Sequence, residues 1–355
     1  MKLQYRLAAT VVVAATAASA FVAKADTFSI TVVSGHPPVN AGVAGIRDFF
    51  IPEVDRRLAE AGNHSISWTE AYGGSVADVQ GVLEAVEMGI GDMGYVPHLF
   101  EGDKLPLEQI TYLAPFSTGD LPALMEVITR LHQEIPEMEE AWRENNQMVL
   151  APVGIDDYQI VSNFPISSAA DLDGRRIGTA GLALNWLRGS GATPVAGALT
   201  DFYNSMATGL IDGAVTFESA VAGYRFHEVA PHVTMIGYGA KYASALTINL
   251  DVWEGLPDEV QQVMLAVSEE YRLRTAESYR SSGENSLAKA AEEGATIHIL
   301  DPEERAHLAE ALPNIALEWA RGLDARGLPG TRTLETYLAL SEEAGLTFAR
   351  DWLNE

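Results

Sequence analysis

The amino-acid sequence predicts an α/β fold with two lobes of similar construction. The prediction rests on a unit of helix, glycine, aspartate and short strand that occurs in residues 73–96 and returns in residues 202–217. In both places apolar residues at helical spacing run into a short apolar segment, which is the pattern of a helix that leads into a buried strand. Two such units far apart in one chain suggest two α/β lobes. The pattern is also common in α/β proteins, so a chance match is the competing interpretation.

The first unit begins with two glycines, after which Ser75 and Asp78 are candidate helix caps. Its helix is expected to end at Gly89, and Asp92 follows in the short strand. The second unit repeats this spacing with Gly209 and Asp212. The apolar stripe of the first helix, which should face the core, consists of Val79, Val82, Leu83, Val86 and Met88.

The N-terminus has the pattern of a secretory signal peptide, residues 1–25. Lys2 and Arg6 precede an apolar Ala/Val run, and Ala-Lys-Ala ends at Ala25. Cleavage after Ala20 is an alternative. The chain has no cysteine, which excludes a lipoprotein anchor and disulfides. We therefore expect an exported, periplasmic protein that is soluble once the signal peptide is removed.

Composition excludes one class of partner. The formal charge is −26, and it becomes −29 when Lys2, Arg6 and Lys24 leave with the signal peptide, since −26 − 3 = −29. A chain this acidic is not expected to bind nucleic acid. The remaining chain of roughly 330 residues can bury a large core and is longer than one average domain.

The chain before residue 155 is expected to alternate strands and helices, beginning with a strand, a loop and a helix. Pro52 lies inside that first helix and predicts a kink or two shorter helices. The expected elements are a strand at 27–35, a helix at 41–61, a strand at 64–72, the first unit, a short apolar segment at 105–116, a helix at 120–145 and a strand at 148–154.

The second part of the chain is expected to repeat this alternation and then to cross back to the first lobe. The crossing strand lies within residues 234–253. The expected elements are strands at 158–162 and after the D-L-x-G run at 171–174, a helix with Trp186, a strand at 193–197, the second unit, the crossing strand, a helix at 257–293, a strand at 296–300, and two helices from about Pro302 and Thr333.

Three segments together resemble the substrate-binding proteins of TRAP (tripartite ATP-independent periplasmic) transporters: GGSVADVQGVLEAVEMGIGDMGYV, DLDGRRIG and FYNSMATGLIDGAV. The resemblance covers residues 26–355. It implies a type II periplasmic binding fold, in which two α/β lobes are joined by crossing strands and a long helix. Lobe I would be 26–153 plus about 243–283, and lobe II 154–242 plus about 284–355. The lobes would close on one small organic solute, which passes to the membrane subunits of a TRAP permease driven by ion gradients.

The chain departs from this family at the expected binding site. Most members end the D-L-K-G segment with an arginine that holds a substrate carboxylate, whereas this chain has Gly178 there. Strand alternation puts Arg176 on the same face, so a shifted arginine is one alternative. Asp156 and Asp157 lie upstream, where many members carry a basic residue. These changes favour an amine or a neutral polar solute. A small organic acid is the alternative because such acids dominate the family.

The resemblance and the neighbouring segments supply the candidate ligand-binding residues. Aromatic rings attract cations, and neutral side chains offer hydrogen bonds. Each residue also has a structural interpretation, as core, cleft wall or solvated acid paired with Arg175 or Arg176. His36 and His98 lie in loops near the expected cleft rim. The candidates are Tyr95, Asp157, Tyr158, Arg176, Trp186, Thr216, Phe217, Glu218 and Asn249.

A periplasmic enzyme is the competing class of function. His227 and His232 superficially resemble a zinc motif, but they are five residues apart with Pro231 between them, so one helix cannot present both. No nucleophile elbow or phosphate-binding loop is present. We expect no catalytic residue, metal or cofactor. A signalling receptor is a third class, and the sequence predicts no oligomeric state.

Overall fold

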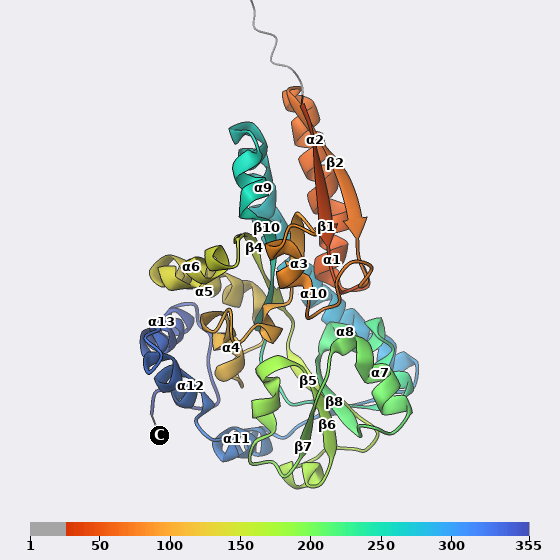
Figure 1. The fold of residues 1–355 in the computed structure, drawn as a ribbon. Coiled ribbons are helices and arrows are strands. Elements are labelled where there is room, and N and C mark those ends of the chain that lie inside the picture. Colours follow the sequence, from red (N-terminus) through yellow and green to blue (C-terminus); the bar gives the residue numbers. More distant parts are fainter. Residues whose placement is uncertain (1–25, 355) are drawn as a thin grey trace, which may run out of the picture.

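The computed structural model describes residues 26–354, and these residues form two β-sheets with helices packed around them (Figure 1). The predicted signal peptide lies outside the described residues. Sheet I has the order β2 (His64–Ala71), β1 (Asp26–Val33), β3 (Met93–Val96), β10 (Lys241–Asn249) and β4 (Gln147–Ile155). Sheet II has the order β11 (Thr296–Ile299), β9 (His232–Met235), β5 (Tyr158–Ser162), β8 (Gly213–Phe217), β6 (Arg176–Thr179) and β7 (Thr193–Ala196).

Three connections join the sheets. Asp156 and Asp157 link β4 to β5, and residues 236–240, which we call the crossover segment, link β9 to β10. The third is α10 (Asp258–Glu292), a helix of 35 residues. It contacts strand β4 of sheet I and the helices α1 (Ala41–Gly45) and α2 (Ile51–Ala61), and it contacts α8 (Glu218–Gly223) beside sheet II. The two-lobe α/β fold with crossing strands and a long helix is therefore confirmed.

The two repeated units have the same local structure. Gly89 and Gly209 end α3 (Val82–Glu87) and α7 (Leu199–Ala207) with positive φ angles of 69° and 70°. Three residues later, Asp92 Oδ2 accepts a hydrogen bond from Thr31 N at 2.7 Å, and Asp212 Oδ2 accepts one from Arg176 N at 2.9 Å. Each aspartate directly precedes its short strand and therefore fixes that strand to a neighbouring parallel strand, β1 or β6.

The helix of the first unit is shorter than predicted. It begins at Val82 after Gly81, with no side-chain cap, so neither Ser75 nor Asp78 caps it. Asp78 Oδ1 instead accepts from Gln80 N in the preceding turn. The backbone around Val79 packs directly on Gly35, where a Cβ atom would lie 2.2 Å from Val79 N. This contact fixes the segment in a non-helical conformation that spacing alone does not reveal.

Proline residues interrupt two of the predicted helices. The helix expected at 41–61 is interrupted, as Pro52 predicts, into α1 (Ala41–Gly45), a π-helix η1 (Ile46–Phe50) and α2 (Ile51–Ala61). The helix expected at 120–145 is wrong, because α5 (Leu121–Glu134) ends before Pro136 and α6 (Pro136–Glu144) begins there.

The C-terminal part has three helices rather than the two expected: α11 (Pro302–Ala311), α12 (Ile315–Asp324) and α13 (Gly330–Glu343). α12 and α13 pack against α4 and α5, which lie in the first part of the chain. The lobe boundaries therefore stay a prediction. The remaining elements are α4 (Ile110–Leu113), α8 (Glu218–Gly223), α9 (Leu250–Gly255) and the 3₁₀ helices η2 (His98–Phe100), η3 (Leu107–Gln109), η4 (Ala169–Leu172), η5 (Gly181–Leu187) and η6 (Phe226–Glu228).

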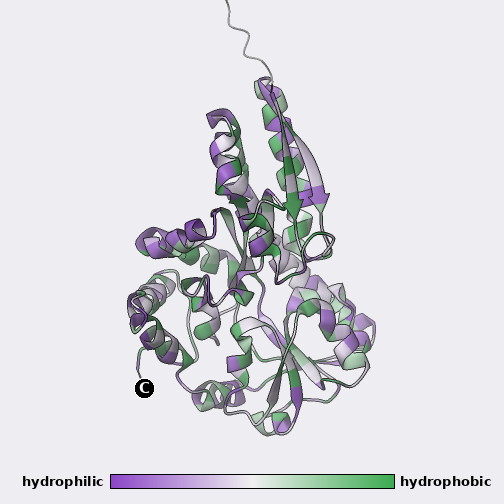
Figure 2. Ribbon diagram, in the orientation of Figure 1, coloured by the Kyte–Doolittle hydropathy of each residue, from purple (hydrophilic) through white to green (hydrophobic). Residues whose placement is uncertain are grey.

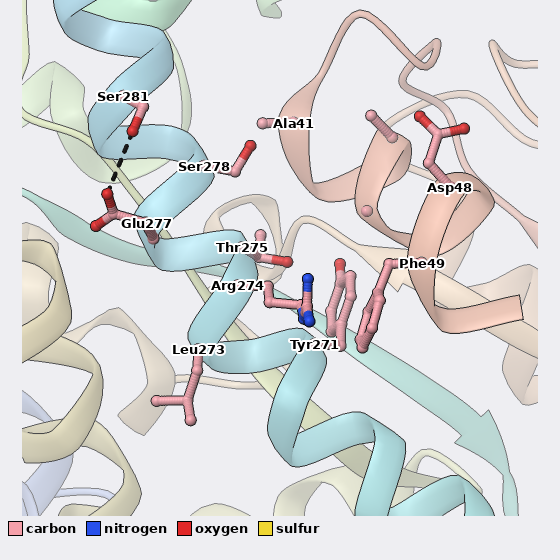
Figure 3. A pocket seen from close by; sticks show the side chains of 12 residues that line it. Ala41, Asp48, Phe49, Tyr271, Leu273, Arg274, Thr275, Glu277, Ser278 and Ser281 are labelled. Carbon is pink, nitrogen blue, oxygen red and sulfur yellow. Dashed lines mark hydrogen bonds between the residues drawn. The ribbon is translucent and has the colours of Figure 1, made fainter. Parts of the chain in front are cut away.

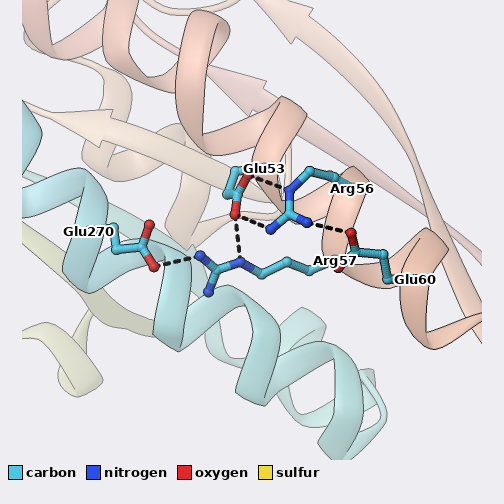
Figure 4. A network of polar contacts seen from close by, with 5 residues as sticks. All are labelled: Glu53, Arg56, Arg57, Glu60 and Glu270. Atoms are coloured by element: carbon cyan, nitrogen blue, oxygen red, sulfur yellow. Dashed lines mark hydrogen bonds and ion pairs between the residues drawn. The ribbon is translucent and has the colours of Figure 1, made fainter.

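Buried hydrophobic side chains pack the helices against the sheets, and most ion pairs lie on the surface. β10 is buried along its whole length, whereas α6 is mainly hydrophilic in Figure 2. Arg57 joins α2 to α10 by pairing with Glu53 and Glu270 (Figure 4). Such partly exposed pairs contribute little to stability. No helix among residues 26–354 is long and apolar enough to span a bilayer.

The equivalence of the two units can be tested by removing the aspartates. Asp92→Ala and Asp212→Ala should each lower the free energy of unfolding by about 1–3 kcal/mol, because a strand N–H loses its acceptor. Urea unfolding measures the change, with exposed Glu254→Ala as the control expected to stay within about 0.5 kcal/mol of the parent. A neutral result for either aspartate would contradict its role as a strand anchor.

Candidate functional site

An enclosed cavity lies between the two sheets, close to the connections that join them. Its volume is about 30 Å³, room for one or two water molecules. Residues from both lobes form its walls. They are His36, Asn40, Tyr95, Leu99, Phe100, Ile155, Tyr158, Ala180, Leu199, Phe202, Val215, Thr216, Phe217 and Ser244.

The cavity is aromatic and carries no formal charge. Within the described chain, no Asp, Glu, Lys or Arg lines it. Burial lowers the pKa of His36 to about 4, so its imidazole is neutral at pH 7. The aromatic rings come from both sides, Tyr95 and Phe100 from one and Tyr158, Phe202 and Phe217 from the other. A bound molecule would therefore meet apolar faces and a few neutral polar groups.

One polar group in the wall has free capacity. Thr216 is 1 % exposed, and its Oγ1 has no hydrogen-bond partner within residues 26–354. Buried hydroxyl groups are nearly always paired, so an unpaired one in a cavity wall marks a position where a ligand or water completes the bond.

The structure brings four of the nine candidate residues together, and it places the other five elsewhere. Tyr95, Tyr158, Thr216 and Phe217 line the cavity. Asp157, Arg176, Trp186, Glu218 and Asn249 are not among the lining residues.

Asp157 points into the junction between the sheets rather than into the cavity. Its Oδ1 accepts a hydrogen bond from Gly239 N at 2.6 Å, in the crossover segment. Lys241 and Arg305 are its electrostatic partners. Burial raises the pKa of Asp157, and the two cations act in the opposite direction by favouring its charged form. Its carboxylate is therefore already engaged by protein groups.

Glu218 and Asp156 lie beside Asp157 and are also engaged. Glu218 Oε1 accepts from Gln159 Nε2 at 3.0 Å, and burial followed by repulsion from Asp157 raises the pKa of Glu218 to about 7. Asp156 accepts from Ser219 N and Oγ at the start of α8. Both carboxyl groups pack against Gly283 of α10. The expectation that Asp156 and Asp157 are solvated acids paired with Arg175 or Arg176 is wrong for both, since Asp156 accepts from Ser219 and Asp157 accepts from Gly239 N.

Trp186 and Asn249 have structural roles. The Trp186 indole Nε1 donates to Tyr112 O at 2.6 Å, and its ring stacks on Tyr238 at a centroid distance of 4.8 Å. Asn249 caps α9 by accepting from Asp251 N and Val252 N.

Arg176 faces away from the cavity. Its guanidinium pairs with Asp212 at 2.8 Å, and its side chain is 45 % exposed. Gly178 lies under the Phe202 ring, since a Cβ atom there would be 3.0 Å from Phe202 Cε1. The position that carries an arginine in most of the resembling proteins is thus covered by an aromatic ring, and Arg176 does not replace that arginine in this conformation.

Several lining residues escaped the sequence analysis as site residues. Asn40 lies in the loop after β1, Leu99 and Phe100 lie in η2 after β3, and Phe202 begins the second unit. Phe202 lies in the apolar pattern of a helix, which does not distinguish a core residue from a cavity wall. The Gly-His-Pro-Pro loop that follows β1 was the available signal for His36 and Asn40, because ligand sites in open α/β sheets lie where strands end.

Gly181 is one of the places where the lobes touch directly. Gly181 has φ +52°, and a Cβ atom there would lie 2.3 Å from Leu99 O. Leu99 lines the cavity from one lobe, and Ala180, beside Gly181, lines it from the other. A solute with several heavy atoms needs more than 30 Å³, so the lobes must separate to admit it.

A larger groove lies on the outside of the molecule. It has a volume of about 600 Å³ and lies between α1, η1 and α10, with Asp48, Phe49 and Arg274 in its wall (Figure 3). Sheet II contributes nothing to it among the described residues, so movement between the lobes would not enclose a molecule there. The enclosed cavity is the better candidate for a binding site.

The histidines of the enzyme hypothesis do not converge. His227 Nε2 lies 2.6 Å from Glu293 Oε2, and His232 Nδ1 lies 2.9 Å from His298 Nε2. Within residues 26–354 no group of three or more His, Asp or Glu is arranged to hold a metal ion.

Comparison with known proteins shows which protein family the chain matches. Residues 55–321 match the profile of the family DctP, described as bacterial extracellular solute-binding protein, family 7. The ectoine-binding periplasmic protein TeaA of Halomonas elongata is 24 % identical over 302 residues, which cover 83 % of this chain and 86 % of that protein. The C4-dicarboxylate-binding periplasmic protein DctP of Rhodobacter capsulatus is 26 % identical over 267 residues, covering 70 % of this chain and 75 % of that protein.

A solved structure has the same fold. The TRAP solute-binding protein of Rhodoferax ferrireducens in complex with copurified benzoate superposes with a TM-score of 0.80. The sequence identity is 17 %, and the match covers 89 % of this chain and 98 % of that one.

Substitution of Gly181 tests the contact between the lobes. In Gly181→Ala the new methyl group should push Leu99 away and increase the radius of gyration measured by small-angle X-ray scattering. Gly174→Ala is the matched control, because Gly174 also has a positive φ, +71°, while no described atom lies within 4 Å of its Cβ position. Equal scattering from both variants would argue against the closure contact.

The raised pKa of Glu218 predicts a pH effect on stability. The folded state holds this proton up to about pH 7 and the unfolded chain only to about pH 4.5, so the group stabilises the fold at low pH and loses this effect between the two values. The unfolding free energy of the parent, minus that of Glu218→Gln, should therefore fall as the pH rises from 4.5 to 7, because only the parent has this titrating group. Urea titrations measure it, and a flat difference would contradict the assignment.

Proposed function

The chain belongs to family 7 of the bacterial extracellular solute-binding proteins, and we propose that it is a receptor that captures one small organic solute in the cavity between its lobes. The family is the TRAP type of periplasmic solute receptor. In our proposal the loaded receptor delivers its solute to the membrane subunits of a TRAP permease. The single observation that supports the site is an enclosed cavity with walls from both lobes and an unpaired Thr216 hydroxyl.

The proposed solute has no net charge. A buried ion needs a counter-charge, and no charged side chain lines the cavity within residues 26–354. Five aromatic rings favour a solute with a flat or apolar face. A hydrogen bond to Thr216 would fix the orientation of that solute. The geometry gives no support to an amine held by Asp157 and Glu218, since both carboxyl groups have protein partners.

A small carboxylate is the second candidate. The relatives named above include one that binds C4-dicarboxylates and one solved with benzoate. In this chain neutral groups would have to hold the acid, because Arg176 pairs with Asp212 and Gly178 has no side chain. The ectoine-binding relative supports the wider ligand range. A receptor without catalysis fits both candidates, because the matching family and the relatives named above are solute-binding proteins.

A thermal-shift screen of the mature protein tests the proposal. The panel contains uncharged and internally charge-balanced solutes, carboxylates, amines and sugars. A ligand at 100 times its Kd adds about 2.7 kcal/mol and should shift Tm by several degrees. Stabilisation by uncharged or charge-balanced solutes supports the proposal. Stabilisation by carboxylates alone would show that the ligand is a carboxylate rather than an uncharged solute. If no compound stabilises the protein, the proposal that it is a solute receptor is contradicted.

Thr216→Val tests whether the unpaired hydroxyl binds the solute. The substitution keeps the shape and removes the hydrogen bond, so Kd measured by titration calorimetry should rise about tenfold, which is about 1.4 kcal/mol. The Tm of the free protein should not fall. Thr179→Val is the control, because Thr179 Oγ1 is also buried and unpaired but does not line the cavity. Unchanged affinity in Thr216→Val would remove Thr216 from the site.

A further inference from the structure

Tyr279 of α10 contacts the cavity walls of both lobes without lining the cavity. It is fully buried. Its hydroxyl lies 2.9 Å from Asn40 Oδ1 and 3.1 Å from the Tyr95 hydroxyl, on the side of sheet I. Its ring packs edge-on against Phe217 of sheet II at a centroid distance of 6.2 Å. All three of these partners line the cavity.

The hydrogen-bonding capacity of this hydroxyl is fully used. A tyrosine hydroxyl donates one bond and accepts two. Tyr279 donates to Asn40 Oδ1, and it can accept from the Tyr95 hydroxyl and from Gly42 N at 3.3 Å. Three hydrogen-bond partners therefore hold the Tyr279 hydroxyl in place, and the hydroxyl helps to hold these partners in place.

This arrangement fixes which way the Asn40 amide faces. Asn40 Oδ1 accepts from Gly42 N at 3.0 Å and from Val43 N at 3.2 Å, and so caps α1. Backbone N–H groups are donors only, so the atom that they meet must be the amide oxygen and not the nitrogen. The Tyr279 hydroxyl supplies a third donor to the same oxygen. The Nδ2 group can donate two hydrogen bonds, and among the described residues the Tyr95 hydroxyl is its hydrogen-bonding neighbour.

We propose that Tyr279 is a positioning residue that holds the Asn40 amide so that one N–H of Nδ2 faces the Tyr95 hydroxyl and the other is available to the solute. This inference rests on the proposed function and narrows it. The solute should carry an acceptor oxygen, such as a carbonyl, ether or hydroxyl oxygen, that Asn40 Nδ2 can reach. Together with Thr216, the site then recognises an uncharged solute by two neutral hydrogen bonds from opposite lobes.

Two tyrosines of the same helix make a matched pair of variants. Tyr279→Phe removes the hydroxyl that meets Asn40. Tyr271→Phe, eight residues earlier, removes an equally buried hydroxyl whose bond, at 2.9 Å, goes to the backbone oxygen of Gly42. Tyr271 lines the outer groove and not the enclosed cavity (Figure 3). Both variants lose one buried hydroxyl, and only Tyr279→Phe loses contact with residues of the cavity wall.

Asn40→Asp separates binding from folding. Aspartate caps helices as well as asparagine does, so α1 should keep its cap. The substitution replaces the two N–H donors by an acceptor oxygen, so a solute that presents an oxygen should bind at least tenfold more weakly.

The test is titration calorimetry of these variants with the solute that gives the largest stabilisation of the parent protein. We expect Tyr279→Phe to raise Kd at least fivefold and Tyr271→Phe to leave it within twofold. In the Asn40→Asp background, Tyr279→Phe should have no further effect on Kd, because the positioned group is gone. Additive losses, or equal losses from the two tyrosine variants, would overturn the proposal.

A second measurement needs no solute, so it separates this inference from the proposed function. A crystal structure of Tyr279→Phe should show the Asn40 amide displaced from its parent position, because only the two backbone donors of the α1 cap still hold it. If the Asn40 amide keeps its position, Tyr279 does not position it, whether or not the parent protein binds a solute in the screen.

Discussion

The crossover segment, residues 236–240, depends on buried and half-buried side chains for its hydrogen bonds, and both lobes depend on the segment. Lys241 Nζ donates to Tyr238 O and Ala240 O, and Arg305 donates to Ile236 O and Gly237 O. Asp157 and Gln159 accept from Gly239 N and Gly237 N. Because unpaired buried backbone groups and unpaired buried charges are both costly, these groups must stay together. The chain therefore crosses between the sheets along one determined path.

This constraint explains why the acids are not in the binding cavity. Asp157 is the electrostatic partner of the buried Lys241 and the half-buried Arg305. Glu218 accepts from Gln159, which in turn accepts from the crossover segment. These charged groups bind one another and the crossover segment, and the cavity is lined by aromatic rings and neutral polar groups instead. In the proposed receptor, the junction would act as the fixed point about which the lobes separate, while Leu99 and Gly181 form the contact that breaks and reforms.

The sequence predicted those features that depend on local spacing. The repeated units, the long helix and the crossing strand follow from periodicity and from glycine and proline positions, and the resemblance to TRAP receptors gave the two-lobe fold. Partners across the fold were not predictable. Asp157, Trp186 and Asn249 have side chains suited to a ligand, but their bonds to Gly239, Tyr112 and Val86 depend on segments far away in sequence. Asn40 was missed for the same reason, since its role follows from Tyr279, 239 residues away.

The measurement that tests the central claim most directly is a crystal structure of the mature protein with the solute that stabilises it most. The account predicts one solute between Tyr95, Phe202 and Thr216, hydrogen-bonded to neutral side chains, with Leu99 packed on Gly181. A solute in the outer groove between α1 and α10, or one held by an arginine in the cleft, would contradict it.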